Sequence, residues 1–101
     1  MQKTLVIIKP DAVQRRLIGK IINRFEEKGL EIVGLKMTVI SEGLAKEHYS
    51  VHEGREYYEN LIKFMTSGPV VMLVLRGMNA IEVTRKLMGS TFGYEADPGT
   101  I

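Results

Sequence analysis

The feature that most constrains the fold is an uninterrupted apolar run, Val70–Leu75, directly after Ser67-Gly68-Pro69. The run is far too short to span a bilayer, and its β-branched residues favour a strand. A strand that is apolar at every position is typical of a central strand covered on both faces. We therefore expect a sheet built around residues 70–76.

Two more segments have the composition of strands, and two others have the period of helices. Thr4–Ile8 is a short β-branched run, and Leu30–Val39 ends in alternating apolar and small or polar residues. Segments 18–28 and 80–88 repeat apolar residues three or four positions apart, as on one helix face. We expect an α+β fold in which the three strands form one antiparallel sheet with both helices on a single face. A fourth strand would complete a β-α-β-β-α-β arrangement.

Small and polar residues mark the expected helix ends. Asp11, Ser41 and Asn79 each stand where a side chain can cap a helix N-terminus. Gly29 suits the C-terminal stop of helix 18–28. The expected inner face of helix 80–88 consists of Ile81, Thr84, Leu87 and Met88.

Composition excludes several classes of function. The chain has no cysteine, which excludes disulfides and thiolate metal sites. The net charge is +2, with +3 in residues 1–50 and −1 in residues 51–101, an asymmetry too mild to indicate nucleic acid or a membrane surface as a partner. Lys9, Pro10 and Asp11 interrupt the first apolar run, which argues against a signal peptide. We expect a cytoplasmic protein.

Lys9 is the first candidate for a chemical role. It follows the strand Thr4–Ile8, and Pro10 fixes the backbone beside it. An ammonium on such a support suits a phosphate. A lysine whose stem covers a sheet edge with its head in water is an equally good interpretation from position alone.

Arg85, Thr91 and Tyr57 are further candidates. Arg85 lies on helix 80–88 and Thr91 just past its end, where a guanidinium fork and a hydroxyl can bind phosphate oxygens. An arginine on an exposed helix face is, however, usually a solvated charge. Tyr58 belongs to an apolar helical stripe, so Tyr57 points elsewhere and either stacks on a base or forms half-buried surface.

No other pattern predicts a catalytic or metal centre. His48 and His52 are the only histidines, and their spacing suits a metal only on a continuous helix, which Gly54 and the polar residues around it argue against. Structural or surface roles are favoured for both. The carboxylates form no convincing acid–base pair, and no G-x-x-x-x-G-K-[ST] phosphate loop is present.

Several stretches, taken together and in order, resemble nucleoside diphosphate kinases. They are TLVIIKPDAV (Thr4–Val13), GKIINRFEEKG (Gly19–Gly29), HY (His48–Tyr49), SGPVV (Ser67–Val71) and PGTI (Pro98–Ile101). Each stretch is weak alone, but the ordered set is highly specific and extends from residue 1 to residue 101. The resemblance implies a ferredoxin-like α+β fold. It also implies a ping-pong reaction in which a histidine takes the γ-phosphate of a nucleoside triphosphate and passes it to a nucleoside diphosphate.

The resemblance implies roles for particular residues and partners. Lys9, Arg85 and Thr91 match phosphate-contacting residues of the family. Tyr57 sits where the family commonly has an aromatic ring against the base, and Tyr49 matches a tyrosine near the catalytic histidine. Mg²⁺ would accompany the nucleotide, held largely by the phosphates and by water. The implied assembly is a homo-oligomer, with a hexamer favoured and a tetramer as the other option.

The sequence departs from the family's pattern in two places. After Thr91 the family often reads Asn-Pro, whereas this chain has Phe92-Gly93, in a loop that the family uses for subunit contacts. The family's catalytic histidine, in an Asn-x-x-His-Gly segment, is expected beyond Ile101 together with the last strand. Residues 1–101 are thus expected to be a single, C-terminally incomplete domain without its nucleophile. The alternative is a non-catalytic ferredoxin-like module for nucleotide binding or protein interaction, which the three phosphate-matching residues disfavour.

Overall fold

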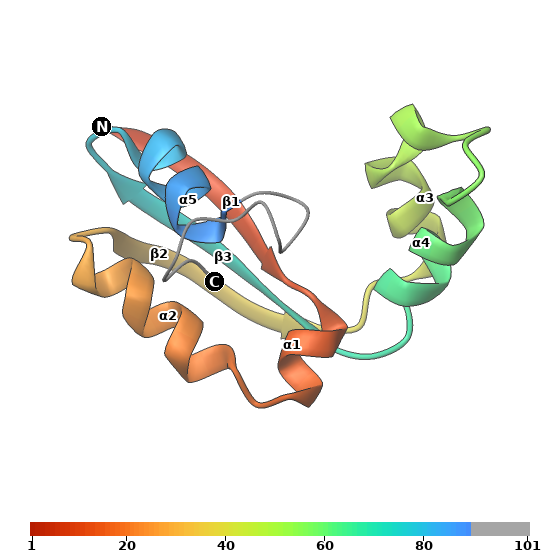
Figure 1. Ribbon diagram of the computed structural model, residues 1–101, viewed down its shortest axis with the longest axis horizontal. Helices are drawn as coiled ribbons and strands as arrows, with labels where there is room; N and C mark the ends of the chain where they lie inside the picture. The colour runs from red at the N-terminus through yellow and green to blue at the C-terminus, as the bar shows by residue number, and fades with distance from the viewer. Residues whose placement is uncertain (90–101) are drawn as a thin grey trace.

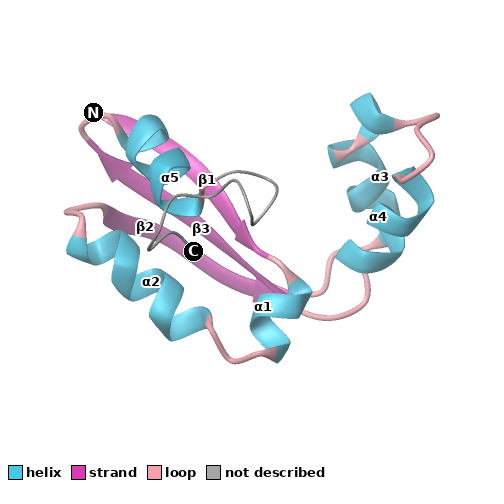
Figure 2. Cartoon of the chain, viewed as in Figure 1, coloured by secondary structure: helices cyan, strands magenta, loops and turns pink. Residues whose placement is uncertain are grey.

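The computed structural model describes residues 1–89. Its elements follow the order strand, two helices, strand, two helices, strand, helix (Figure 1, Figure 2). Their bounds are β1 Gln2–Ile8, α1 Pro10–Gln14, α2 Ile18–Glu27, β2 Glu31–Thr38, α3 Glu42–His48, α4 Tyr58–Met65, β3 Val70–Gly77 and α5 Ala80–Met88. A 3-10 turn, Ser50–His52, lies between α3 and α4. No helix in this part of the chain is long and apolar enough to cross a membrane.

The third strand of the described residues, β3, is the central one. Both neighbours pair with it in antiparallel fashion, in the order β1-β3-β2. Gln2 pairs with Gly77 at one end of β1, and a register shift between Ile32 and Gly34 interrupts the pairing of β2. The expectation that these three segments form one antiparallel sheet is confirmed.

The helices α2 and α5 pack on one face of the sheet, as expected. Phe25 of α2 is fully buried there, and so are Leu73 and Leu75 of β3. Because alternate residues of a strand point to the same face, these two leucines share one core with Val6, Ile8, Ile21, Leu30, Val71, Ala80 and Leu87. This core holds α2 and α5 against the sheet.

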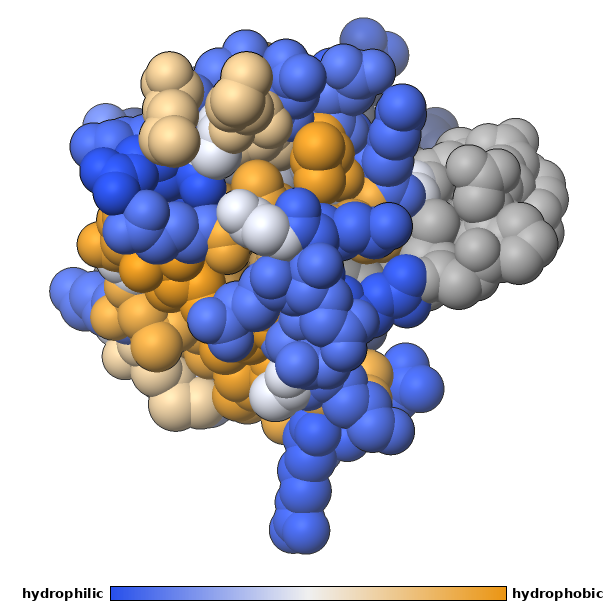
Figure 3. All heavy atoms as spheres, turned by 90° about the vertical axis from the view of Figure 1, so that its left-hand side faces the viewer, coloured by the Kyte–Doolittle hydropathy of each residue, from blue (hydrophilic) through white to orange (hydrophobic). Residues whose placement is uncertain are grey.

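The opposite face of the sheet is open among residues 1–89, so the expectation that Val70–Leu75 is covered on both faces is wrong there. Leu5 of β1 is 54% exposed there, and Met72 and Val74 of β3, on the same face, are only partly buried. The reason is the position of the α3–α4 hairpin, which packs around Val70 and against Ile7 and Met72, and so covers only one end of this face. Figure 3 shows apolar residues, in orange, gathered on one side of the molecule.

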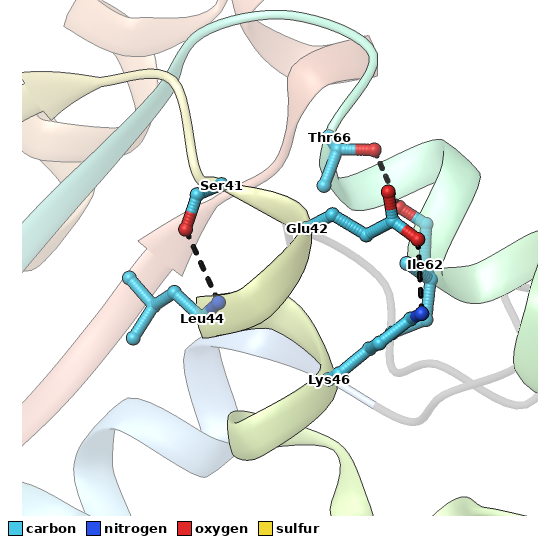
Figure 4. A network of polar contacts seen from close by, with 6 residues as sticks. All are labelled: Ser41, Glu42, Leu44, Lys46, Ile62 and Thr66. Carbon is cyan, nitrogen blue, oxygen red and sulfur yellow. Dashed lines mark hydrogen bonds and ion pairs between the residues drawn. The ribbon is translucent and has the colours of Figure 1, made fainter.

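Two of the expected helix ends are confirmed. Gly29 follows α2 with φ of 82°, and its N–H donates to the carbonyl of Glu26 at 2.9 Å, one of the two bonds of a Schellman ending. At the start of α3, the hydroxyl of Ser41 accepts the N–H of Leu44 at 3.1 Å (Figure 4). Gly29 therefore ends α2 through its left-handed conformation, and Ser41 caps α3 through its hydroxyl, as the sequence predicted.

The start of α5 differs from the expectation. Asn79 occupies the N-cap position in the left-handed conformation, with φ of 56°, but its side chain makes no capping hydrogen bond. The bond comes from β1 instead, because Oε1 of Gln2 accepts the N–H of Ile81 at 3.2 Å. The first turn of α5 is thus tied to the first strand of the sheet.

The buried face of α5 also differs in part. Thr84 and Leu87 are buried as expected, whereas Ile81 and Met88 are each 42% exposed. Ala80 is fully buried in their place, so the inner face follows positions 80, 84 and 87, which are spaced as on one helix face. The small Ala80 side chain lets the first turn approach the sheet closely.

Candidate functional site

Lys9 stands at the junction of β1 and α1, and its backbone is fixed on both sides. Pro10 is the first residue of α1, where its locked φ suits a helix start. The carbonyl of Lys9 accepts the N–H of Val13 at 3.1 Å. Asp11, which was expected to cap this turn, lies inside it, because Pro10 starts the helix one residue earlier. The Lys9 side chain is exposed, so a rigid backbone presents its ammonium to solvent.

A hollow of about 290 Å³ opens beside this lysine. Lys9, Asp11 and Arg15 supply its charged groups, and the rest of its lining is apolar, including Phe25 of α2 and Met88 of α5. Two cations against one carboxylate give the hollow a net positive charge, which favours an anion. Arg15 was not among the residues expected from sequence, since a basic residue after one helical turn carries no signal of its own.

Arg85 is exposed on α5 and borders a different hollow, near the start of that helix. Met88, at the other end of α5, lines the hollow beside Lys9. Arg85 precedes Met88 by three residues, which is about 4.5 Å of helical rise. The structure therefore places the backbone of Arg85 about one turn from the hollow of Lys9, but their side chains border different hollows. Thr91 lies outside the described residues.

Tyr57 directly precedes α4 and is 49% exposed, whereas Tyr58 packs partly buried against the core of the hairpin. This agrees with the expectation that Tyr57 points away from the apolar stripe. The hydroxyl of Tyr57 lies 2.7 Å from Nδ1 of His52. The sequence did not predict this hydrogen bond, because residues five positions apart are not neighbours on a regular helix face.

Tyr49 is half-buried where α3 ends. Its ring meets the imidazole of His48 edge-on, with centroids 4.6 Å apart, and the ring of His52 lies 6.3 Å away. Burial raises the pKa of the Tyr49 phenol above its usual value of 10.0. Tyr49 therefore stays neutral across the physiological range, and its hydroxyl remains a hydrogen-bond donor.

The two histidines do not share a continuous helix, as expected. His48 is the last residue of α3, and His52 lies in the 3-10 turn that follows. Among residues 1–89, no three histidine, cysteine, aspartate or glutamate side chains are grouped so that they can hold a metal ion.

The fold and these side chains together define a class of protein. A three-stranded antiparallel sheet with helices on one face presents a lysine at a rigid strand–helix junction. The hollow beside it is cationic, and a half-exposed aromatic ring stands on the helical hairpin. The cationic hollow of this α+β domain suits an anionic group, and the half-exposed ring of Tyr57 offers a surface for a planar group.

Comparison with known proteins gives the family. The family model described as nucleoside diphosphate kinase matches residues 2–101. The nucleoside diphosphate kinase of Thermoplasma volcanium is 52% identical over 101 residues, which cover all of this chain and 69% of that protein. The enzyme of Methanocaldococcus jannaschii is 54% identical over 100 residues, covering 99% of this chain and 71% of that one.

Solved structures agree. A halophilic nucleoside diphosphate kinase from Halobacterium salinarum in complex with CDP has a TM-score of 0.97 at 49% identity and covers 99% of this chain. A transition-state mimic of the enzyme from Borrelia burgdorferi, with vanadate and ADP, has a TM-score of 0.92 at 46% identity and also covers 99%. This chain spans 66% and 62% of those two chains, respectively.

The chain belongs to the nucleoside diphosphate kinase family. The resemblance inferred from the ordered sequence stretches is thereby confirmed, and so are the α+β fold and the enzyme class that it implied. This chain spans about two thirds of the length of the relatives and structures that it matches.

Proposed function

We propose that the protein transfers the γ-phosphate of a nucleoside triphosphate to a nucleoside diphosphate through a phosphohistidine. An imidazole nitrogen attacks the γ-phosphorus, the bond to the bridging oxygen breaks, and the nucleoside diphosphate leaves; a second diphosphate then takes the phosphoryl group. Family membership supports the reaction. The observation in this chain that carries it is Lys9, held at a rigid junction beside a cationic hollow. The nucleophile is assigned to the histidine expected beyond Ile101.

The proposed nucleotide contacts follow from the chemistry of each side chain. The Lys9 ammonium and the Arg85 guanidinium bind phosphate oxygens by charge-assisted hydrogen bonds, and Thr91 adds a hydroxyl. Tyr57 supplies a half-exposed ring for the base. Tyr49 lies near the reacting histidine. Similar proteins bind CDP or ADP, according to their structures, and nucleoside di- and triphosphates are the proposed ligands here.

Mg²⁺ is the proposed cofactor, and we propose that it enters with the nucleotide. Phosphate oxygens and water suit Mg²⁺ as ligands. Lys9 and Arg15, which border the hollow, are cations themselves, so this donor set suits phosphate oxygens and not a bare metal ion. The ion would neutralise charge that develops between the β- and γ-phosphates.

A homo-oligomer is also part of the proposal, with a hexamer favoured and a tetramer as the other option. The observation that supports association is the exposed apolar surface of the sheet, where Leu5, Leu35 and Met37 are each more than half exposed. Contiguous exposed apolar surface on a soluble protein commonly marks an interaction site. A cytoplasmic location remains a proposal of the same kind.

The experiment that tests the proposed function is nucleotide binding to the full-length protein. Lys9→Met keeps the apolar stem and removes the charge, which should weaken ADP binding by about 1.5–3 kcal/mol, or roughly ten- to a hundredfold. Lys20→Met removes an exposed lysine of α2 as a matched control. If calorimetry gives the same ADP affinity for both variants, the phosphate role of Lys9 is wrong. Tyr57→Ala should weaken ADP and GDP to similar extents, because stacking accepts any base.

A further inference from the structure

The ring of Tyr57 is exposed but not free. Tyr57 occupies the N-cap position of α4, outside the regular helix, and makes no side-chain capping bond. Its hydroxyl is bonded to Nδ1 of His52 at 2.7 Å. This bond exists in either protonation state of the imidazole, since the phenol donates to neutral Nδ1 and accepts from a protonated one. The hydroxyl of Tyr57 can therefore keep this contact whether it acts as the donor or as the acceptor.

His52 is itself held firmly enough to serve as an anchor. Its N–H donates to the carbonyl of Tyr49 at 2.9 Å, and its own carbonyl accepts the N–H of Arg55 at 3.0 Å. The ring of Tyr49 is a second aromatic neighbour of the imidazole, with centroids 6.3 Å apart. Because the backbone of His52 is bonded in both directions, and the carbonyl of Arg55 accepts the N–H of Tyr58 at 3.1 Å, the backbone that carries the imidazole has a defined position relative to α4.

The contact leaves the ring of Tyr57 open for stacking. It runs through the hydroxyl, at the edge of the ring, and the planes of the two rings are tilted by 58°. His52 therefore fixes the direction of the ring without stacking on its face. A ring held in this way is oriented before a ligand binds.

We propose that His52 is a positioning residue that orients Tyr57 for the nucleotide base. This inference rests on the proposed function, in which Tyr57 meets the base. Ordering a mobile side chain on binding costs an amount equivalent to roughly two- to tenfold in affinity. A ring that is already oriented avoids that loss, so the bond to His52 strengthens binding of every nucleotide and leaves phosphate contacts unchanged.

The test separates the ring, its hydroxyl and the anchor in the full-length protein. Tyr57→Phe removes only the hydroxyl, and His52→Ala removes the anchor; each should weaken ADP binding by roughly two- to tenfold. The double variant should bind no more weakly than the weaker single variant, because both changes break one bond. His52→Asn should restore affinity, since its amide stands near the position of Nδ1. His48→Asn is the matched control and should leave ADP affinity unchanged.

A base-free probe distinguishes positioning from a loss of structure. Inorganic tripolyphosphate, measured by competition, should bind wild type, Tyr57→Phe and His52→Ala equally. If these variants lose affinity for tripolyphosphate as much as for ADP, or if they keep wild-type affinity for ADP, the positioning role is wrong. Tyr57→Ala reports on the proposed function separately: if it leaves ADP affinity unchanged, the ring does not meet the base, whereas a loss confined to Tyr57→Ala overturns only the role of His52.

Discussion

Replacing Gly29 by alanine should destabilise the protein for a purely conformational reason. Gly29 closes α2 at φ of 82°, and a Cβ built there meets no atom within 4 Å. No steric contact therefore contributes, and the cost is that of the left-handed conformation, about 1–2 kcal/mol for a residue with a Cβ. Alanine also restricts the conformations of the unfolded chain, which offsets about 0.4–1 kcal/mol of this cost. The net loss should be near 1 kcal/mol.

Gly19 offers a matched control in the same helix. It lies in the first turn of α2, its φ is not positive, and a Cβ there also meets nothing within 4 Å. Gly19→Ala should therefore stabilise the protein by about 0.5–1 kcal/mol, from helix propensity and the restricted unfolded chain together. The two substitutions are chemically identical and should act in opposite directions, about 1.5–2 kcal/mol apart.

Urea unfolding followed by circular dichroism measures this difference. With a slope of about 2 kcal/mol per molar urea, the two midpoints should differ by roughly 1 M. Gly29→Asn should cost less than Gly29→Ala, because asparagine tolerates the left-handed conformation better. Equal midpoints for Gly19→Ala and Gly29→Ala would refute the argument, and so would a Gly29→Ala variant more stable than wild type.

Three further predictions concern activity, assembly and pH. A polypeptide that ends at Ile101 should transfer no label from γ-labelled ATP to GDP, because its only imidazoles are His48 and His52 and a misplaced imidazole contributes little. Labelled GTP would contradict this prediction. A chain that also carries the Asn-x-x-His-Gly segment should react in the same assay. Light scattering should show the full-length protein as a homo-oligomer at micromolar concentration, and a monomer would remove that proposal. Burial raises the pKa of the Tyr49 phenol in the folded state, so the contribution of the neutral phenol to stability is complete below pH 10 and is lost as the pH rises through the pKa of the folded state. Tyr49→Phe should reduce this loss of stability at alkaline pH. Identical alkaline unfolding profiles for the variant and wild type would contradict the prediction.

Local sequence signals predicted the elements well. Apolar residues repeating three or four positions apart placed α5 at 80–88, its observed bounds, because the period is a property of the helix itself. Ser41 and Gly29 were also found where they act. The start of α5 was mispredicted, since the acceptor that replaces the Asn79 side chain is Gln2, which is distant along the chain and near only in the fold.

The site was predictable in its residue types but not in its contacts. Lys9 was found because a strand, a lysine and a proline are consecutive in sequence. The bond between Tyr57 and His52 was missed because the irregular turn between them sets their distance, and no regular period describes such a turn. The open face beside Val70–Leu75 was missed for a related reason. A run that is apolar at every position is compatible with burial on both faces, but it does not show which other elements cover each face.

The central place of β3 has a consequence for folding during synthesis. Within residues 1–89, the strands β1 and β2 do not pair with each other, and each pairs only with β3, Val70–Gly77. While the first 69 residues emerge from a ribosome, both strands therefore expose unpaired backbone edges, which favour association with other chains. Completing the sheet also requires closing loops over most of the chain, which slows folding compared with local contacts. A nascent chain of this topology should bind chaperones until β3 has emerged and should be released soon afterwards.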